Sequence, residues 1–357
     1  MMPIVSSPYL HGGDSIRLTM MSVILALLPA SFMAIYLFGW LAVFIITVSM
    51  ISCVLTEWLC LRWMGRSTKP VWDGSAALSG LLLALTLPPT LPWWMVLLGS
   101  IFAIVLGKQV YGGLGYNLFN PALSARVILL ISFPLQMTTW LMPMSDPRAA
   151  VDLYDAAVAW SLFCSGPQGI GQALDAITMA SPLGHVKTEW TVGVGVTDAL
   201  VHYNYSYLNA FLGLEAGSLG ETSALALLIG GIYLLARHTI TWHIPFAYLA
   251  TVALLAAIFN SIDAERFAPP MFHLLAGGLM LCAFFMATDP VSSPVTPLGR
   301  LIFGVGCGIL TWCIRTFGGY PEGAMFAVLL MNCAVPLIDH YCRPRVYGHS
   351  VDRDAGS

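Results

Sequence analysis

Charged residues are scarce in this sequence: 15 lysines and arginines and 18 aspartates and glutamates make up 9% of its 357 residues. Soluble domains carry about 25% charged residues, so the low content argues against a soluble enzyme. A disordered chain is excluded because 58% of the residues are hydrophobic. The formal net charge of −3 lacks the basic surplus that binds nucleic acid. A polytopic membrane protein remains.

Motifs of familiar soluble active sites are also missing. The sequence contains no HExxH, P-loop or GxSxG motif. None of its eight cysteines forms a CxxC pair or an iron–sulfur spacing, and only Cys164 lies away from the apolar stretches, where cysteine behaves as a small hydrophobic residue. We therefore predict no metal site and no structural disulfide.

Apolar stretches are what the sequence has in abundance. Ten of them reach or nearly reach the roughly 20 residues that a membrane-spanning helix needs. They fall at residues 19–38, 40–63, 75–91, 93–111, 121–138, 221–236, 243–262, 271–288, 298–316 and 322–341. The strict alternation of a membrane β-barrel is absent, and an open sheet would leave its edges unsatisfied in lipid. We predict an all-α polytopic membrane protein with ten transmembrane helices.

The distribution of lysine and arginine predicts the orientation. With the N-terminus inside, most basic residues flank the cytoplasmic ends of the spans, and those left outside are Arg148, Lys187, Arg266 and Arg315. Both termini are then cytoplasmic, including a tail at 343–357. The first apolar stretch is longer than a signal-peptide core and has no clear cleavage site, so we interpret it as a retained span.

Residues 139–220 interrupt the series of spans and are expected outside, as a lobe between helices five and six. Aromatic and apolar groups at 160–163 and 192–196 predict an ordered lobe that packs on the membrane domain. Loops of this length are usually functional or disordered.

Five spans precede the lobe, within residues 1–138, and five follow it, within 221–342. An odd number of spans in each half would make the halves an inverted repeat, with a functional path near their interface. A short similarity between residues 75–87 and 223–235 is compatible both with such a repeat and with chance matching of leucine-rich helices.

The lobe contains one motif that can carry chemistry, the stretch DAITMASPL at 175–183. Taken alone, any hydroxyl here is a turn or helix cap. The pattern D-[AG]-x-[ST]-x-A-[ST], however, resembles the signature read by the flavin transferase that joins FMN, through its phosphate, to the last hydroxyl. That hydroxyl, on Ser181, needs to be exposed on a flexible segment. Small Ala180 lets the transferase approach, and Asp175 is placed to help hold its substrate.

Longer motifs are distributed over nearly the whole chain. They are SPY at 7–9, DGS at 73–75, GLLLALTLPP at 80–89, PWWMVLLGSIFAIVLGKQVYGGLGYNLFNPAL at 92–123, ATDPVSSPVT at 287–296, GRLIFG at 299–304 and GGYPEGAMFAVLLMNCAVPLIDHY at 318–341. Together they resemble the family of D subunits of the Rnf complex, an electron-transport complex also called ferredoxin:NAD oxidoreductase. They are also similar to the B subunit of the sodium-pumping NADH:quinone reductase.

The resemblance implies two inverted five-helix halves with a urea-transporter-like fold in a bacterial inner membrane, and a periplasmic lobe. It implies FMN as a phosphoester on the outer side and, in some members, a non-covalent riboflavin in the membrane part. The motif places FMN on Ser181, where the family more often has threonine, with Thr178 as the alternative. Ser181 would be a tether, and no catalytic residue is expected on this chain.

The same resemblance implies the partners. Other Rnf subunits would pass electrons between ferredoxin and NAD through this chain, coupled to export of Na+ or H+. The flavin transferase would mature the protein, and lipid would surround it. We expect no nucleic-acid partner. A plain solute channel of the urea-transporter type, and a scaffold without a cofactor, are the alternatives, because fold alone allows all three.

Several polar residues at the ends of the apolar stretches are candidates for a flavin site or ion path, because charge in a membrane is costly and often functional. Asp73 is either a helix cap or a cation or flavin ligand. Lys108 and Arg126 bracket the motif between spans four and five, and either hold a flavin or anchor the helices at the interface. Asn120 belongs to an unwound linker that offers carbonyl groups. Asp289 is either a cation-path carboxylate or a turn residue paired with Arg300.

Two further acids have simpler expectations. Glu57 is expected to pair with Arg62, and Asp339 with Arg343, at the inner ends of their spans. Tyr320-Pro321-Glu322 is expected to be an ordinary helix start, since proline is common there.

Overall fold

The computed structural model describes residues 16–143, 155–166, 178–221 and 223–342. The first half contains α1 (Ile16–Phe38), α2 (Trp40–Trp63), the short η1 (Lys69–Asp73), α3 (Ser75–Thr86), α4 (Trp93–Ile104), the π-helical η2 (Val105–Gln109), α5 (Pro121–Ser132) and α6 (Pro134–Met137). The second half contains α12 (Ala224–Ala236), α13 (His243–Ile262), α14 (Pro270–Leu275), α15 (Leu279–Leu281), the π-helical η4 (Cys282–Met286), α16 (Pro297–Phe317) and α17 (Ala324–Tyr341).

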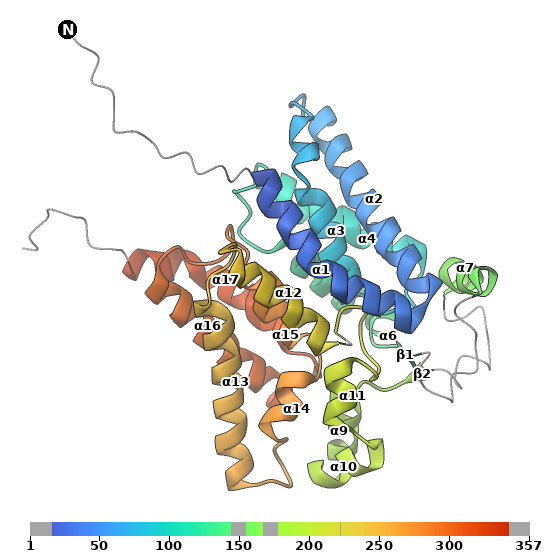
Figure 1. Ribbon diagram of the computed structural model, residues 1–357, viewed down its shortest axis with the longest axis vertical. Helices are drawn as coiled ribbons and strands as arrows, with labels where there is room; N and C mark the ends of the chain where they lie inside the picture. Colours follow the sequence, from blue (N-terminus) through green and yellow to red (C-terminus); the bar gives the residue numbers. More distant parts are fainter. Residues whose placement is uncertain (1–15, 144–154, 167–177, 222, 343–357) are drawn as a thin grey trace, which may run out of the picture.

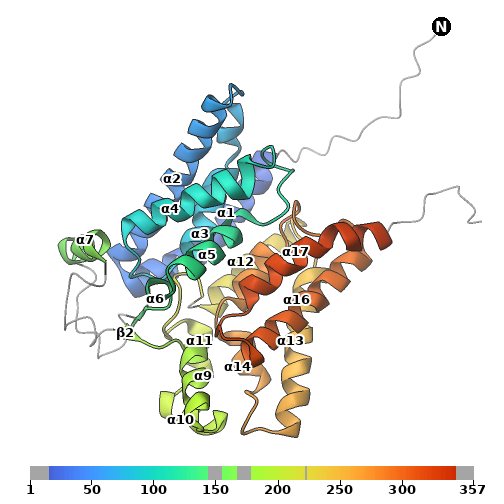
Figure 2. The ribbon, with the colours of Figure 1, turned by 180° about the vertical axis from the view of Figure 1, so that it is seen from behind.

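Between the halves lie β1 (Trp140–Leu141), α7 (Ala156–Ser165), β2 (Thr178–Met179), α9 (Pro182–Val192), α10 (Val196–Tyr203) and α11 (Tyr207–Leu212). Figures 1 and 2 show α1 to α5 gathered on one side, α12 to α17 on the other, and α9 to α11 projecting from one end. The two short strands pair antiparallel, with Trp140 opposite Met179 and Leu141 opposite Thr178.

The helices account for the membrane character of the chain. Among the described residues, α1, α2, α13, α16 and α17 are long and apolar enough to cross a membrane, and further apolar helices are shorter. Every apolar stretch in the sequence coincides with a helical segment. The chain is therefore a mostly helical, multi-pass membrane protein.

The stretch at 271–288 is not the continuous helix that its apolar sequence predicts. It divides into α14, α15 and η4, and the break lies where Gly277 adopts a φ of +71°. A Cβ atom at this glycine would lie 2.8 Å from Leu183 Cδ1 and 3.0 Å from Arg315 Nη2. The break thus lets α9 of the lobe and α16 approach the backbone closely, which hydropathy does not register.

The two halves repeat one packing pattern. In the first half α2 packs against α3 and α4, and α4 packs against α5; in the second, α13 packs against α14 and α16, and α16 packs against α17. Contacts of α1 with α12 and of α5 with α17 join the halves. The similar residues 75–87 and 223–235 fall mainly on α3 and α12.

Different helices of the described lobe pack against different halves of the membrane domain. Trp160 and Phe163 of α7 pack against Phe44 of α2, with ring centroids 5.4 and 5.7 Å from the Phe44 ring. By contrast, α9 and α10 share a small apolar core with the second half, which contains Leu183, Val196, Ala268, Phe272 and Ala276. The lobe helices α9 and α10 are thereby held against the broken helix of the second half.

Candidate functional site

Ser181 lies at the N-terminus of α9, where its Oγ accepts a hydrogen bond from the Gly184 amide at 3.2 Å. Its side chain is only 6% exposed. This corrects the expectation of a freely exposed hydroxyl: Pro182 begins the helix and Ser181 caps it, which turns the hydroxyl inward. Ala180 is exposed, Thr178 lies in β2, and Asp175 falls outside the described residues.

Ser181 borders a small cavity of about 20 Å³, which we call the Ser181 cavity. Its polar lining includes Tyr205 and Glu215 of the lobe together with Glu221 and Glu322 of the second half. Burial raises the pKa of both Tyr203 and Tyr205, and the nearby Glu215 carboxylate raises it further. Both phenols therefore stay protonated beside the hydroxyl.

A much larger cleft of about 760 Å³ runs along α9, and Leu183 lines both this cleft and the Ser181 cavity. We call it the α9 cleft. Its lining combines aromatic rings with basic groups: Trp190, Phe267, Phe272, Phe317, Lys187, Arg266 and Arg315. A cleft with apolar walls and a few cationic groups suits a planar, anionic organic ligand.

Lys187 secures one wall of this cleft. Its Nζ donates hydrogen bonds to the carbonyl groups of Arg315 at 3.3 Å, of Tyr320 at 3.1 Å, and of Gly318, all near the C-terminus of α16. Burial lowers the pKa of the Lys187 ammonium group. A lobe helix therefore caps a helix of the membrane domain.

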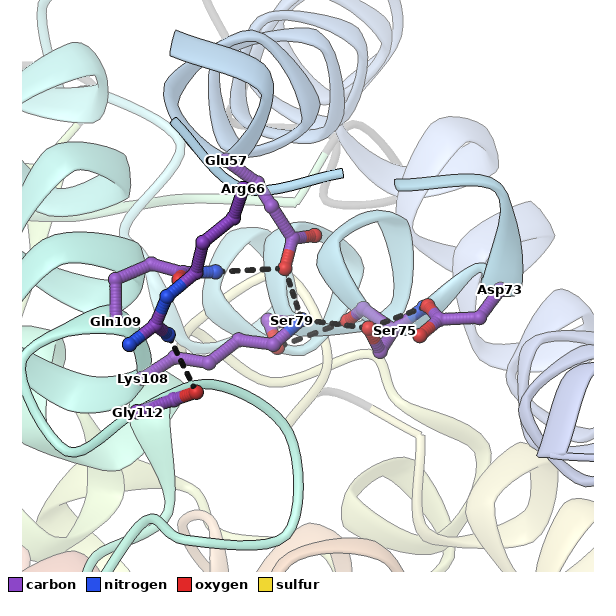
Figure 3. Close-up of polar contacts among 8 residues, drawn as sticks. All are labelled: Glu57, Arg66, Asp73, Ser75, Ser79, Lys108, Gln109 and Gly112. Atoms are coloured by element: carbon purple, nitrogen blue, oxygen red, sulfur yellow. Dashed lines mark hydrogen bonds and ion pairs between the residues drawn. The ribbon is translucent and has the colours of Figure 1, made fainter. Parts of the chain in front are cut away.

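A second site lies far from Ser181 in the first half and is centred on Lys108 of η2 (Figure 3). Lys108 Nζ lies 2.6 Å from Glu57 Oε1 and donates to Ser75 Oγ at 2.6 Å, and its side chain is 3% exposed. Gln109 also donates to Glu57, at 2.9 Å. The expected Glu57–Arg62 pair is wrong, because the α2 helix turns Glu57 inward while the Arg62 guanidinium lies over the Trp58 ring.

Asp73 extends the Lys108 network at the start of α3. Its Oδ1 accepts from the Ser75 amide at 2.8 Å and from Ser75 Oγ at 2.6 Å, while that same Oγ accepts from Lys108 (Figure 3). Asp73 thus makes the local contact of a helix-start residue and also orients the serine that Lys108 contacts.

Lys108, Asn120 and Asp289 come together around one cavity of about 80 Å³ between the halves, which we call the Lys108 cavity. Asn120 caps α5 through its Oδ1 and donates from Nδ2 to the Met286 carbonyl at 3.4 Å. Asp289 accepts from the Val291 amide at 3.3 Å and from Ser292 Oγ at 3.1 Å. Three residues widely separated in sequence are therefore neighbours here.

Asp289 does not form the suggested pair with Arg300. The Arg300 guanidinium instead donates to the Pro294 carbonyl at 3.0 Å and to Thr241 Oγ1 at 3.2 Å. Asp339 accepts from the Val295 amide at 3.2 Å, and its expected partner Arg343 lies outside the described residues.

Arg126 of α5 does not share a site with Lys108, although the two residues bracket one motif in the sequence. Its Nη2 donates to Glu322 Oε2 at 3.2 Å, its guanidinium lies 5.8 Å from the Trp140 ring, and it is 1% exposed. Both basic residues are buried in ion pairs, so the alternative of anchoring at the membrane interface is wrong for both.

Comparison with known proteins decides the family. A model of the NQR2, RnfD, RnfE family matches residues 4–348. The chain belongs to this family. Among its relatives is a protein from Stutzerimonas stutzeri that is named as the D subunit of an ion-translocating oxidoreductase complex, 49% identical over 337 residues that cover 94% of this chain and 93% of that one. Proteins with the same name from Halorhodospira halophila and Escherichia coli O157:H7 are each 44% identical; they cover 98% and 97% of this chain, and 96% and 98% of their own lengths.

Sequence reasoning missed residues that this member of the NQR2, RnfD, RnfE family buries beside Ser181. Glu221 and Glu322 precede α12 and α17, and Arg315 lies in α16; all three are less than 9% exposed. The interpretation of Glu322 as part of an ordinary helix start overlooked its bond with Arg126, 196 positions away. The available signal was an acid at the start of two apolar helices, where a soluble protein would expose it.

Proposed function

We propose that this chain is the D subunit of an ion-translocating oxidoreductase complex and carries FMN as a phosphoester on Ser181. The proposal rests on its full-length similarity to proteins of that name and on one structural observation. That observation is the Ser181 hydroxyl at the N-terminus of a long lobe helix, whose later residues line a 760 Å³ cleft. Ten spans in two inverted, urea-transporter-like halves, with cytoplasmic termini and a periplasmic lobe, complete the proposed arrangement.

The N-terminus of α9 offers hydrogen-bond donors to a phosphate ester. Free amide groups and the helix dipole make a helix N-terminus an anion site, and α9 extends over 11 residues. The Gly184 amide that now binds the hydroxyl can serve a phosphate oxygen instead. The α9 cleft is large enough for the isoalloxazine ring, with Trp190 and Phe267 for apolar contact and Arg266 for charge.

Bound FMN would supply one-electron chemistry that side chains lack. Ser181 holds the group in place, Lys187 keeps the cleft wall against α16, and the protonated Tyr205 stands ready as a hydrogen-bond donor. Because Ser181 is 6% exposed, attachment requires α9 to lift from the membrane half or precedes its docking. Ferredoxin- and NAD-linked subunits would exchange electrons through the chain.

We assign the ion path, for Na+ or H+, to the region of the Lys108 cavity. Asp289 offers a carboxylate, Asn120 an amide and Lys108 an ammonium group whose charge Glu57 balances. Its volume of about 80 Å³ admits a cation with two or three waters, at about 30 Å³ per water. The Lys108 cavity is too small for a riboflavin, which could bind there only if the helices that line the cavity moved apart.

Fluorescence of the denatured chain tests the flavin assignment. The protein is produced with and without the flavin transferase, separated under denaturing conditions and viewed under ultraviolet light. We expect a bright band with the transferase, loss of the band in Ser181→Ala, and retention in Ser181→Thr, which keeps the nucleophilic oxygen.

Thr178→Ala is the matched control and should stay bright. A dark wild-type band in the presence of the transferase would contradict flavin attachment. A solute channel or a scaffold without a cofactor would then be the remaining functions. A bright Ser181→Ala band that darkens only with Thr178→Ala would move the attachment to Thr178.

A further inference from the structure

Glu221 and Glu322 lie together in the buried wall of the Ser181 cavity. Both carboxyl groups line this cavity, and the two side chains come from the starts of α12 and α17. Glu322 Oε2 accepts from Arg126, and Glu221 Oε2 accepts weakly from the Ser218 amide at 3.4 Å. Two ionised carboxylates that share one small cavity repel each other, and a proton on either one removes the repulsion.

Several buried polar atoms around this pair have no hydrogen-bond partner in the described parts of the chain. They are Glu221 Oε1, Ser218 Oγ, and the Nε and Nη1 atoms of Arg126. Ser218 and Arg126 are 0% and 1% exposed. Buried groups of this kind in native proteins are normally satisfied by water or a bound ligand. Of these residues, Glu221 borders the Ser181 cavity, whose volume of about 20 Å³ is enough for one water molecule.

The charges around the pair do not balance when every group is ionised. Glu221, Glu322 and Glu215 contribute three negative charges, against the two positive charges of Arg126 and Arg315. Other titratable groups nearby include Cys282 of η4, Tyr203 and Tyr205 of the lobe, Tyr248 of α13, and His273, whose carbonyl binds Arg315. One added proton would remove the excess negative charge from a buried site, where an uncompensated charge is expensive.

We propose that Glu221 and Glu322 form a proton-binding site that takes up one proton when a flavin at Ser181 is reduced. This inference rests on the proposed function, because Ser181 lines the same cavity as both carboxyl groups. An electron that reaches the flavin adds negative charge beside the cavity, and a proton in the carboxyl pair compensates it.

The step balances with one electron and one proton. The electron comes from a one-electron carrier of a partner subunit, and the proton comes from water that reaches the cavity. The new O–H bond forms on Glu221 Oε1, an oxygen without a hydrogen-bond partner among the described residues. Reoxidation by the next carrier removes the electron and releases the proton.

A proton suits this site better than Na+. The guanidinium of Arg126 already occupies one side of Glu322, at 3.2 Å, and would repel a second cation. The close approach of Glu221 Oε1 to Gly278, where an added Cβ would lie 2.6 Å away, leaves little room for an ion shell.

Redox-difference infrared spectroscopy of the purified complex tests the proposal. Reduction should produce a carboxylic-acid carbonyl band that shifts in deuterium oxide. We expect Glu221→Gln and Glu322→Gln to abolish this band, and Glu221→Asp, which keeps an acid, to retain it at a shifted frequency. Glu189→Gln, a matched change on the cleft-distant, half-exposed face of α9, should leave the band unchanged.

The flavin midpoint potential provides a second readout. In the wild type it should fall with rising pH, by up to about 59 mV per tenfold change in proton concentration for a one-electron step. In Glu221→Gln the dependence should flatten. An unchanged band in both glutamine variants, or a band that follows Na+ concentration at constant pH, overturns the proton site. A dark band in the denaturing gel defeats the proposed function and with it the coupling, whereas a fluorescent band without the carboxyl signal defeats the proton site alone.

Discussion

At the scale of single residues, basic side chains that the sequence places near helix ends are buried against specific oxygen atoms. Lys108 contacts Glu57 and Ser75, Arg126 contacts Glu322, and Lys187 contacts the carbonyl groups that end α16. Burying such charges is tolerable only when a partner is present. Each pair joins segments that are distant in the chain, so its loss should affect more than one helix.

Lys108→Met should destabilise the first half strongly. It leaves the Glu57 carboxylate, which is 1% exposed, without its cation, and breaking a buried pair costs about 3–5 kcal/mol. The double variant Glu57→Gln/Lys108→Met removes both charges and should recover much of the loss. Thermal unfolding in detergent measures the effect.

The exposed Lys69 provides the control for this experiment. Lys69→Met should change the unfolding temperature little, because an exposed charge has no buried partner. Equal unfolding temperatures for Lys69→Met and Lys108→Met would contradict the buried pair.

At the scale of elements, the contacts between helices depend on a few caps and on residues without side chains. The N-terminus of α9 is capped by Ser181, and Lys187 from the same helix caps α16. Between the two halves, α12 packs closely against α1 because Gly230 lies at the contact. These features connect the lobe to the second half and the second half to the first.

Lys187→Met should weaken the attachment of α9 to α16. It removes the donor that serves three carbonyl groups, at a cost of about 1–3 kcal/mol for the buried acceptors left unpaired. Burial lowers the Lys187 pKa from its ordinary value of 10.5. Between the lowered pKa and 10.5 the unfolded chain holds the proton and the folded chain does not, so the free energy of unfolding should rise with pH in this window.

Denaturant unfolding across the alkaline range checks this pH dependence. The rise attributed to Lys187 should vanish in Lys187→Met and persist in Lys69→Met. The same slope in all three proteins would show that Lys187 is not buried in solution.

Gly230→Ala should separate α12 from α1. A Cβ at Gly230 would overlap the Ala26 carbonyl oxygen and lie 2.9 Å from Phe285 Cζ. Small residues let membrane helices approach this closely, and overpacking such a contact costs about 1–3 kcal/mol or more. We expect a lower unfolding temperature and a lower yield of folded protein by gel filtration.

The matched control is Gly319→Ala, since no atom lies within 4 Å of a Cβ added there. It should behave as the wild type. If Gly230→Ala were equally stable, the two halves would not meet through this glycine.

At the scale of the whole molecule, the two halves repeat one packing pattern and enclose polar sites at different levels. The Lys108 cavity lies between the halves, and the Ser181 cavity lies where the lobe meets the second half. If the lobe is periplasmic, as proposed, these sites face opposite sides of the membrane. Electron transfer at one and ion movement at the other would then require the halves between them to transmit the change.

Cysteine labelling tests this orientation. Cys164 is exposed on α7, and Cys342 lies just after α17 near the C-terminal end of the described chain. In right-side-out membrane vesicles, a membrane-impermeant maleimide should label a variant that keeps only Cys164. A variant that keeps only Cys342 should react after permeabilisation alone, and the reverse pattern would invert the topology.

The sequence predicted the helical segments well because apolar runs and proline are local signals. Pro121 after Asn120 starts α5, and Pro88-Pro89 lies just beyond the end of α3. The break at Gly277 was missed because a glycine in an apolar run does not reveal which neighbours approach it. The Glu57 partner was missed because helix periodicity does not say which distant lysine faces an acid.

Composition and local pattern by themselves determined that this is a multi-pass helical membrane protein, placed its helical segments, and indicated its family through motifs. Only the tertiary structure decided that Ser181 is a buried cap, that Lys108 and Arg126 belong to different sites, and that Glu221 and Glu322 line one cavity. The physical reason is the separation in sequence over which each interaction acts. Hydrophobicity and capping act over a few residues, whereas a buried charge is neutralised by whichever group the folded chain brings near, and that group can lie nearly two hundred positions away.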